Sequence, residues 1–363
     1  MQRHRKLSRS LKHLLLVGTM LVVGPAAIAQ PQAGNIPPVD ETMSPYASTE
    51  DSVRLPDGRM LHFVCMGEGS PTVILSAGMG ESSATAWSRV QADMAKITRV
   101  CPWDRPGFGL SDGSAAPVDV STIADDLAAA LTSGTLPGPY VMVGHSLGSY
   151  ETLLFTDRHP DQVVGMVLVD PSIPQQTKLW QQLEPDLPAP NDAQDPMVRI
   201  FRNCAAAIRA GTAKPEGPDP DRCFALPPMW PIALRQALTA KMADPVQYET
   251  MASFIANSAS ASDQVVNSSR NYRDMPLIVL SAGDRLQAPP GAPPPPPLTE
   301  AQMARQAARE AVFDRGQAEL AELSTNGVNL RVPGANHHIQ LSQPQAVIDA
   351  VAEVVEKVRA SGR

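Results

Sequence analysis

Short apolar runs alternate with amphipathic stretches along much of the chain. The apolar runs are short and often continuous, which is typical of strands buried on both faces of a parallel sheet. The segments 121–131 and 147–158 instead repeat apolar residues at helical spacing. Together they predict a parallel sheet with helices on both faces. The predicted strands span residues 52–55, 60–65, 72–75, 98–103, 140–143, 162–169, 277–281 and 328–332.

This alternation stops after residue 170 and returns at residue 276. Residues 171–275 contain many Pro and Gln residues, helix-like pieces such as 230–242, and no clear strand. We therefore expect a helical cap at 171–275, inserted between two core segments at 51–170 and 276–363. Its residues Trp180, Phe224, Met229 and Trp230 would either form the core of this cap or contact a substrate. A proline run at 293–297 predicts a surface spacer, and residues 30–50 an extended leader.

The first 29 residues have the composition of an export signal. Five Lys and Arg residues precede the apolar run 14–29, which ends in the small-x-small sequence Ala27-Ile28-Ala29. The alternative is an uncleaved membrane anchor, for which this run is short. A cleaved signal predicts a periplasmic or secreted protein.

Composition and charge exclude several classes of protein. Of 363 residues, 43% are hydrophobic and 18% are charged, which excludes a wholly disordered chain. Removing residues 1–29 leaves 25 basic and 37 acidic residues, a net charge of −12. Such a surface repels phosphate backbones, so we expect no nucleic-acid partner. Because no other apolar stretch approaches spanning length, we expect no stable membrane association after signal cleavage. Composition leaves the oligomeric state open.

A glycine-rich motif lies between a predicted strand and a predicted helix. A serine at such a turn exposes its hydroxyl, and small residues on either side relieve the crowding that the sharp turn creates. The start of the helix favours negative charge that develops beside it. The alternative is an ordinary glycine-rich turn. We predict that the serine is a nucleophile within the motif Gly144, His145, Ser146, Leu147 and Gly148.

A serine nucleophile needs a base within hydrogen-bond reach. His337 ends the sequence G-A-N-H, just after the last predicted strand, and His338 follows it. Here the sequence resembles the α/β-hydrolase fold superfamily, whose members end their last strand with G-x-[GN]-H. The resemblance selects His337; for His62, His145 and His159 we expect solvated or packing roles. The segment 104–112 (D-R-P-G-F-G-L-S-D) is similar to a structural turn of the same family.

The resemblance covers nearly all of the chain after the signal. It implies an α/β-hydrolase fold, with a mostly parallel eight-stranded sheet, helices on both faces and an inserted helical cap. It also implies an oxyanion hole made by the backbone N–H groups of Met79 and Leu147. The acid of the triad stays open between Asp170, which ends the strand at 162–169, and Asp284, which follows the strand at 277–281. We favour Asp170, because Asp284 is one residue short of the usual spacing.

The four cysteines can form two disulfides in an exported protein. In this fold Cys65 and Cys101 would lie on neighbouring strands, and Cys204 and Cys223 are close in sequence within the cap. Buried free thiols are the alternative. Because no C-x-x-C or H-x-x-x-H pair is present, we expect no metal site.

The sequence thus predicts an exported serine hydrolase without a cofactor. It would cleave carboxylic esters of small or medium uncharged substrates through an acyl-enzyme on Ser146, with His337 as base. One alternative is an amide or peptide hydrolase that uses the same triad. Another is a non-catalytic binding module of the same fold.

Overall fold

A computed structural model describes residues 38–185, 195–285 and 297–362. The predicted signal at 1–29 lies outside the described residues, as do residues 30–37 of the predicted leader and residues 293–296 of the proline run. Among the described residues, none of the helices is both long and apolar enough to cross a membrane.

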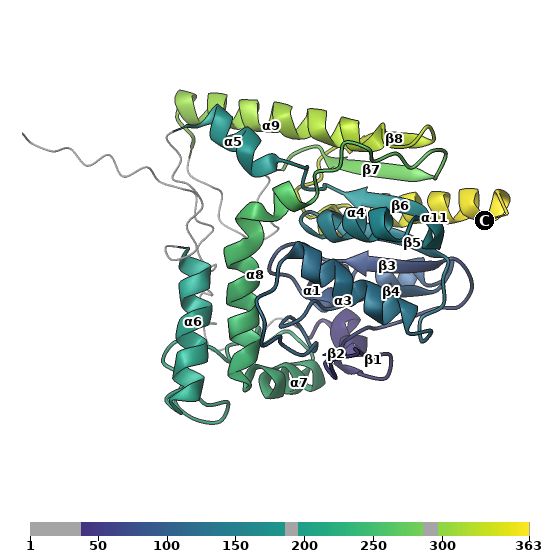
Figure 1. The fold of residues 1–363 in the computed structure, drawn as a ribbon. Coiled ribbons are helices and arrows are strands. Elements are labelled where there is room, and N and C mark those ends of the chain that lie inside the picture. The colour runs from purple at the N-terminus through teal and green to yellow at the C-terminus, as the bar shows by residue number, and fades with distance from the viewer. Residues whose placement is uncertain (1–37, 186–194, 286–296, 363) are drawn as a thin grey trace, which may run out of the picture. The chain divides into compact units, whose positions relative to one another are not determined.

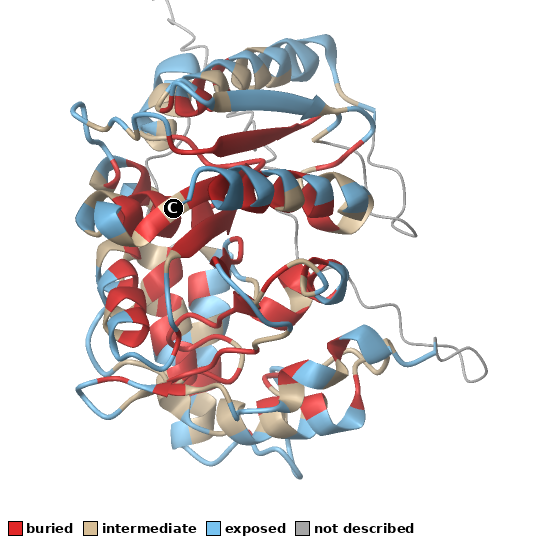
Figure 2. Ribbon diagram, turned by 90° about the vertical axis from the view of Figure 1, so that its right-hand side faces the viewer, coloured by how far each residue is buried: buried red, intermediate tan, exposed pale blue. Residues whose placement is uncertain are grey.

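The central sheet contains six strands within the described residues, all parallel, in the order β4-β3-β5-β6-β7-β8 (Figure 1). Their carboxyl ends share one edge of the sheet, which is where sites form in open α/β folds. The outermost strand, β8, is largely exposed, whereas β7 is buried throughout (Figure 2). The strands are β3 (Thr72–Ser76), β4 (Val100–Pro102), β5 (Tyr140–His145), β6 (Val163–Val169), β7 (Leu277–Ala282) and β8 (Gly327–Val332).

The prediction of one eight-stranded sheet is wrong in one respect. The first two strands, β1 (Val53–Arg54) and β2 (Met60–Leu61), pair only with each other in the described structure. After β2 the backbone of His62 accepts a hydrogen bond from the Asp104 N–H and donates one to the Ser111 hydroxyl. Beyond His62 the chain pairs with the segment of β4 only through isolated antiparallel bridges, Phe63 with Trp103 and Met66 with Val100. Pro102 of β4 has no N–H group and cannot donate a hydrogen bond to extend this pairing.

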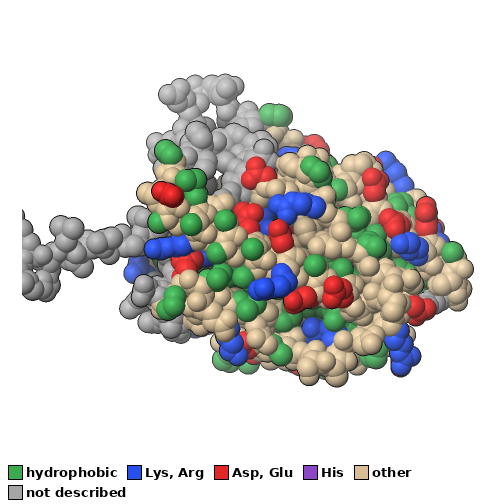
Figure 3. All heavy atoms as spheres, turned by 90° about the horizontal axis from the view of Figure 1, so that it is seen from above, with side chains coloured by type: hydrophobic (Ala, Val, Ile, Leu, Met, Phe, Trp, Pro, Cys, Tyr) green, Lys and Arg blue, Asp and Glu red, His purple; other side chains and the backbone are tan. Residues whose placement is uncertain are grey.

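Helices cover both faces of the sheet, because successive strand residues point to opposite sides. Met142 packs in one apolar cluster with Leu127 of α3, and its neighbour Val141 packs in another with Val354 of α11. On the face shown in Figure 3, charges of both signs are mixed with apolar side chains. The helices of the core are α1 (Ser83–Trp87), α2 (Gln91–Met94), α3 (Val120–Thr132), α4 (Gly148–Arg158), α9 (Glu300–Ala321), α10 (Ile339–Ser342) and α11 (Pro344–Ala360).

The described part of residues 171–275 contains helices and no strand. In Figure 1, α8 stands between α6 and the sheet. A proline follows the capping aspartate at the start of both α6 and α8, where its fixed φ suits a first helical turn. These helices are α5 (Gln176–Leu183), α6 (Pro196–Arg209), α7 (Ile232–Met242) and α8 (Pro245–Gln264).

The described end of the predicted leader is not extended. Glu41–Ala47 forms a 3-10 helix, η1, in which Asp40 caps the first turn by accepting from the Thr42 N–H. The side chain of Tyr46 is 1% exposed, and its hydroxyl donates to the Gln91 side chain at 2.5 Å. Proline content alone suggested an extended segment, but burial of this apolar side chain stabilises a helical turn.

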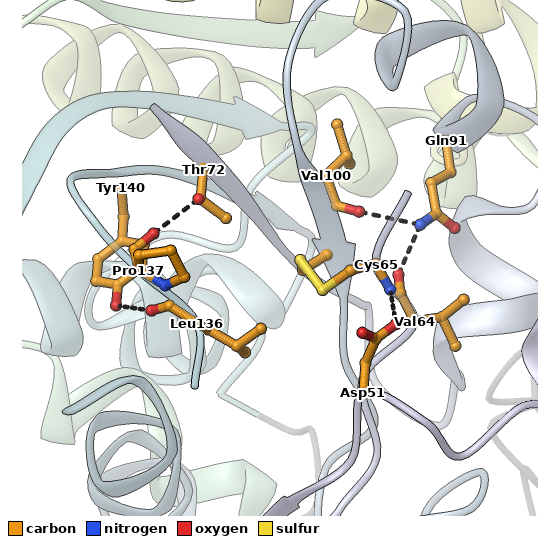
Figure 4. Close-up of a disulfide and its surroundings, with 10 residues drawn as sticks. Asp51, Val64, Cys65, Thr72, Gln91, Val100, Leu136, Pro137 and Tyr140 are labelled. Carbon is orange, nitrogen blue, oxygen red and sulfur yellow. Dashed lines mark hydrogen bonds between the residues drawn. A yellow bond between two sulfur atoms is a disulfide. The ribbon is translucent and has the colours of Figure 1, made fainter. Parts of the chain in front are cut away.

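Both predicted disulfides are present. Cys65 pairs with Cys101 of β4, and Cys204 of α6 pairs with Cys223. The first disulfide lies beside the side chain of Gln91, which donates to the carbonyl oxygens of two neighbouring segments (Figure 4). It therefore ties the segment after β2 to an edge strand of the sheet, while the second disulfide closes a loop of the cap.

Candidate active site

Ser146 occupies a strained turn between β5 and α4. Its φ is +50°, a left-handed value that a residue with a side chain seldom adopts. Hydrogen bonds hold this backbone in place: its N–H donates to the Val169 carbonyl at 3.1 Å, and its carbonyl accepts from the Ser172 N–H at 3.0 Å. A Cβ atom at Gly148 would lie 2.6 Å from the Ser76 carbonyl oxygen, so this tight approach of α4 to β3 requires glycine.

Two hydrogen bonds connect Ser146 to a histidine and an aspartate. The Oγ of Ser146 lies 2.9 Å from Nε2 of His337, and Nδ1 of His337 lies 2.7 Å from Oδ2 of Asp170. Ser146 follows β5, Asp170 follows β6 and His337 follows β8. The shared edge of the parallel strands therefore brings together residues that are far apart in the sequence.

The structure places Asp170, and not Asp284, beside His337. Asp170 is 0% exposed, and its carboxylate also accepts from the Ala282 N–H at 3.0 Å, from Arg285 at 3.0 Å and from Gln317 at 3.1 Å. Burial acts to raise the pKa of Asp170, but these donors and His337 lower it to about 2. Asp284 is exposed.

Sequence reasoning missed Arg285 and Gln317, the side chains that hold Asp170. Arg285 follows Asp284 directly, so the segment after β7 contributes to the site through its arginine and not through its acid. Gln317 lies on α9, a helix far along the chain from Asp170. Because a buried carboxylate needs hydrogen-bond donors, the burial of Asp170 by itself requires side chains such as these.

The surroundings of His337 favour its neutral form. Burial lowers the pKa of His337, and the neighbouring His145 and His338 lower it further, although Asp170 opposes them. The Asp170 carboxylate accepts a hydrogen bond from Nδ1–H, which leaves Nε2 free to accept one from the Ser146 hydroxyl. This tautomer is the one that a general base needs.

The sequence predicted an oxyanion hole from the backbone N–H groups of Met79, in the turn after β3, and of Leu147, which precedes α4. Neither N–H group makes a hydrogen bond to a described residue. The carbonyl groups of the two residues before Met79 are held by Arg105, which donates to Ala77 and, at 2.9 Å, to Gly78. The oxyanion hole itself stays a prediction.

Of the four apolar residues predicted for the cap, three pack against neighbouring side chains. Trp180 packs against Phe313 with ring centroids 5.5 Å apart, Phe224 packs beside the Cys204–Cys223 disulfide, and Trp230 packs with the cluster around η1 and α7. These contacts favour the cap-core interpretation over substrate contact. Among the described residues, the structure contains no group of three His, Cys, Asp or Glu side chains that could hold a metal ion.

Comparisons with known proteins place these features in a family. An uncharacterised protein of Schizosaccharomyces pombe is 43% identical over 81 residues, 22% of this chain and 15% of that protein. Lipase LipV of Mycobacterium tuberculosis is 32% identical over 113 residues, 31% of this chain and 42% of the lipase. The matches to curated relatives cover between 15% and 44% of those proteins.

Solved structures show the same fold at low sequence identity. A thermophilic esterase of Thermogutta terrifontis, solved with malate bound, is 18% identical with a TM-score of 0.51, over 85% of this chain and 98% of the esterase. A sequence model of the alpha/beta hydrolase family matches residues 73–350, which include Ser146, Asp170 and His337. This chain therefore belongs to the alpha/beta hydrolase family.

Proposed function

We propose that this protein is a serine hydrolase that cleaves carboxylic esters of small or medium uncharged substrates through an acyl-enzyme on Ser146. The observation that supports this most is the pair of hydrogen bonds, at 2.9 and 2.7 Å, that links Ser146 through His337 to Asp170. The family contains enzymes that use such an arrangement for acyl transfer.

In the proposed reaction, Nε2 of His337 accepts the Ser146 proton while Oγ attacks the carbonyl carbon of the ester. The oxyanion that forms accepts hydrogen bonds from the N–H groups of Met79 and Leu147. His337 then donates its proton to the leaving alkoxide, which leaves the acyl group on Ser146. A water molecule, activated by His337 in the same way, attacks this acyl-enzyme and releases the acid, and Asp170 stabilises the imidazolium in both steps.

We further propose that the protein is exported to the periplasm or secreted. The two disulfides support this, because disulfides persist in oxidising compartments. The export signal proposed at 1–29 accounts for the route. Thiol counting on the denatured protein without a reductant tests the disulfides: we expect no free thiol, and four free thiols would contradict them.

Ester turnover and active-site labelling test the proposed function together. The wild-type protein should hydrolyse p-nitrophenyl esters of two to twelve carbons, with highest kcat/KM for short or medium acyl chains. A fluorophosphonate should add one mass increment, on Ser146. The Ser146→Ala variant should lose both, with kcat lower by at least about 10⁴-fold. Ser260→Ala, an exposed serine of α8, is the matched control. Wild-type protein that is folded but neither turns over esters nor is labelled would refute the proposal.

A further inference from the structure

A buried cluster of ionisable side chains lies behind the predicted oxyanion hole. Glu81 follows the turn that carries Met79, and its Oε2 accepts from the Gly78 N–H at 2.7 Å and lies 3.0 Å from Nδ1 of His145. Its Oε1 lies 3.2 Å from Nε2 of His338. The reaction proposed above assigns no step to these side chains.

His145 lies between two hydrogen-bond acceptors. Nδ1 faces the Glu81 carboxylate, and Nε2 lies 3.0 Å from the carbonyl oxygen of His337. Burial acts to raise the pKa of Glu81, but His145 and His338 hold it well below its usual value. His145 thus joins the oxyanion turn to the backbone of the catalytic histidine.

Hydrogen bonds hold three of the four backbone polar groups in the two peptide units at Gly78, and the Met79 N–H is the fourth. The Gly78 N–H is held by Glu81, and the Gly78 carbonyl by Arg105. Because a peptide unit is planar and trans, holding the Gly78 carbonyl points the Met79 N–H in the opposite direction. A Cβ atom at Gly78 would lie 2.5 Å from Oε2 of Glu81 and 2.8 Å from Nδ1 of His145, so the turn is packed directly against this pair.

We propose that Glu81 is a positioning residue for the oxyanion hole. It holds the turn through Gly78 so that the Met79 N–H is aimed at the developing oxyanion, and through His145 it locks that turn to the segment that carries His337. His338 holds the second carboxylate oxygen of Glu81 through its Nε2. This inference rests on the proposed esterase function, because it assigns a role within that reaction.

The Glu81→Gln variant tests the role with a minimal change of shape. Its amide oxygen can still accept a hydrogen bond, but its NH₂ group cannot, and the negative charge that faces His145 and His338 is lost. Loss of an oxyanion donor costs about 10² to 10³ in kcat, and a donor that is displaced but still present costs less. We expect kcat to fall by about 10- to 100-fold with KM within threefold of wild type.

A transition-state analogue separates positioning from a general structural effect. A phenylboronic acid forms a tetrahedral adduct on the serine and places an oxygen in the oxyanion hole. Its affinity should fall by the same factor as kcat/KM in Glu81→Gln, while the affinity of a neutral product analogue should not change. Glu353→Gln, which removes an exposed carboxylate of α11, is the charge-matched control and should match wild type in every measurement.

The results distinguish this inference from the proposed function. Ester turnover by wild type, with unchanged kcat or unchanged boronate affinity in folded Glu81→Gln, would overturn the positioning role alone. Absence of turnover in wild type and Glu353→Gln would instead overturn the proposed function. If Glu81→Gln does not fold, the His338→Gln variant is the test, because His338 is only half-buried and its replacement disturbs the fold less. We expect kcat of this variant to fall threefold or more at constant KM. A wild-type kcat would overturn the inference.

Discussion

Replacing Asp170 by asparagine is the most direct test of the site. The carboxylate accepts from Nδ1 of His337, from the Ala282 N–H, from Arg285 and from Gln317. An amide NH₂ in place of either oxygen would meet donors and leave at least one buried hydrogen bond unmade. The substitution therefore disturbs both the orientation of the histidine and the stability of the fold.

Both effects can be given a magnitude. The fall in the pKa of Asp170, from 3.8 to about 2, corresponds to about 2 kcal/mol of stabilisation of the folded state at neutral pH. Because the folded pKa is the lower one, this contribution is present above about pH 5 and is lost as the pH falls toward 2. An asparagine in a triad allows the wrong imidazole tautomer and lowers kcat by about 10⁴, or about 5 kcal/mol of barrier.

The assay compares Asp170→Asn with Asp284→Asn. We expect Asp170→Asn to lose about 10³- to 10⁴-fold in kcat on a p-nitrophenyl ester and about 2 kcal/mol in urea unfolding at pH 7. Asp284→Asn, at an exposed position, should stay within twofold of wild type in kcat and within 0.5 kcal/mol in stability, as is usual for surface changes. Near-wild-type turnover by both variants would refute the triad assignment, and an equal loss in both would refute the choice of acid.

Other consequences can be measured on the same protein. Because burial lowers the pKa of His337, kcat/KM should rise with pH through a pKa below 6.5 and then stay level; a buffer series that shows the rise above pH 7 contradicts this. The double variant Cys204→Ser, Cys223→Ser opens a loop with a sequence separation of 19 residues and should lose about 3 kcal/mol in urea unfolding, whereas an unchanged midpoint contradicts the entropic argument. Gly148→Ala places a methyl group against Ser76 and should lower the unfolding free energy by about 1–3 kcal/mol, together with kcat; thermal unfolding with wild-type values would show that the elbow tolerates a side chain.

Periodicity identified most strands but not their sheet partners. The run predicted at 162–169 is β6, Val163–Val169, and the run at 72–75 is β3 with one residue added. An apolar pattern reports which residues are buried, and that was enough for these strands. It does not report which backbone groups bond to each other, and the backbone of His62 bonds to a loop instead of a strand.

In the site, too, the local sequence indicates some residues, whereas the roles of others depend on segments far apart in the chain. The local sequence around Ser146 contains the strand, the turn and the small residues that the elbow needs, so the serine could be predicted. The acid could not be decided in that way, since Asp170 and Asp284 each follow a strand that ends at the same edge. The choice depends on Arg285 and Gln317, which hold one carboxylate beside His337 and come from segments that no local pattern connects with it.

The side chains beside the proposed oxyanion hole show why that information is needed. A carboxylate placed there would by itself oppose the negative charge that develops on the substrate, so Glu81 alone would be unfavourable. The rings of His145 and His338 face this carboxylate and lower its pKa, so they stabilise it where it holds the turn. The same two rings lower the pKa of His337, which favours the neutral base. The side chains that support the turn therefore also act on the base. In the motif that identified Ser146 the residue before the serine is unspecified, so only the fold shows that His145 joins Glu81 to the segment of His337.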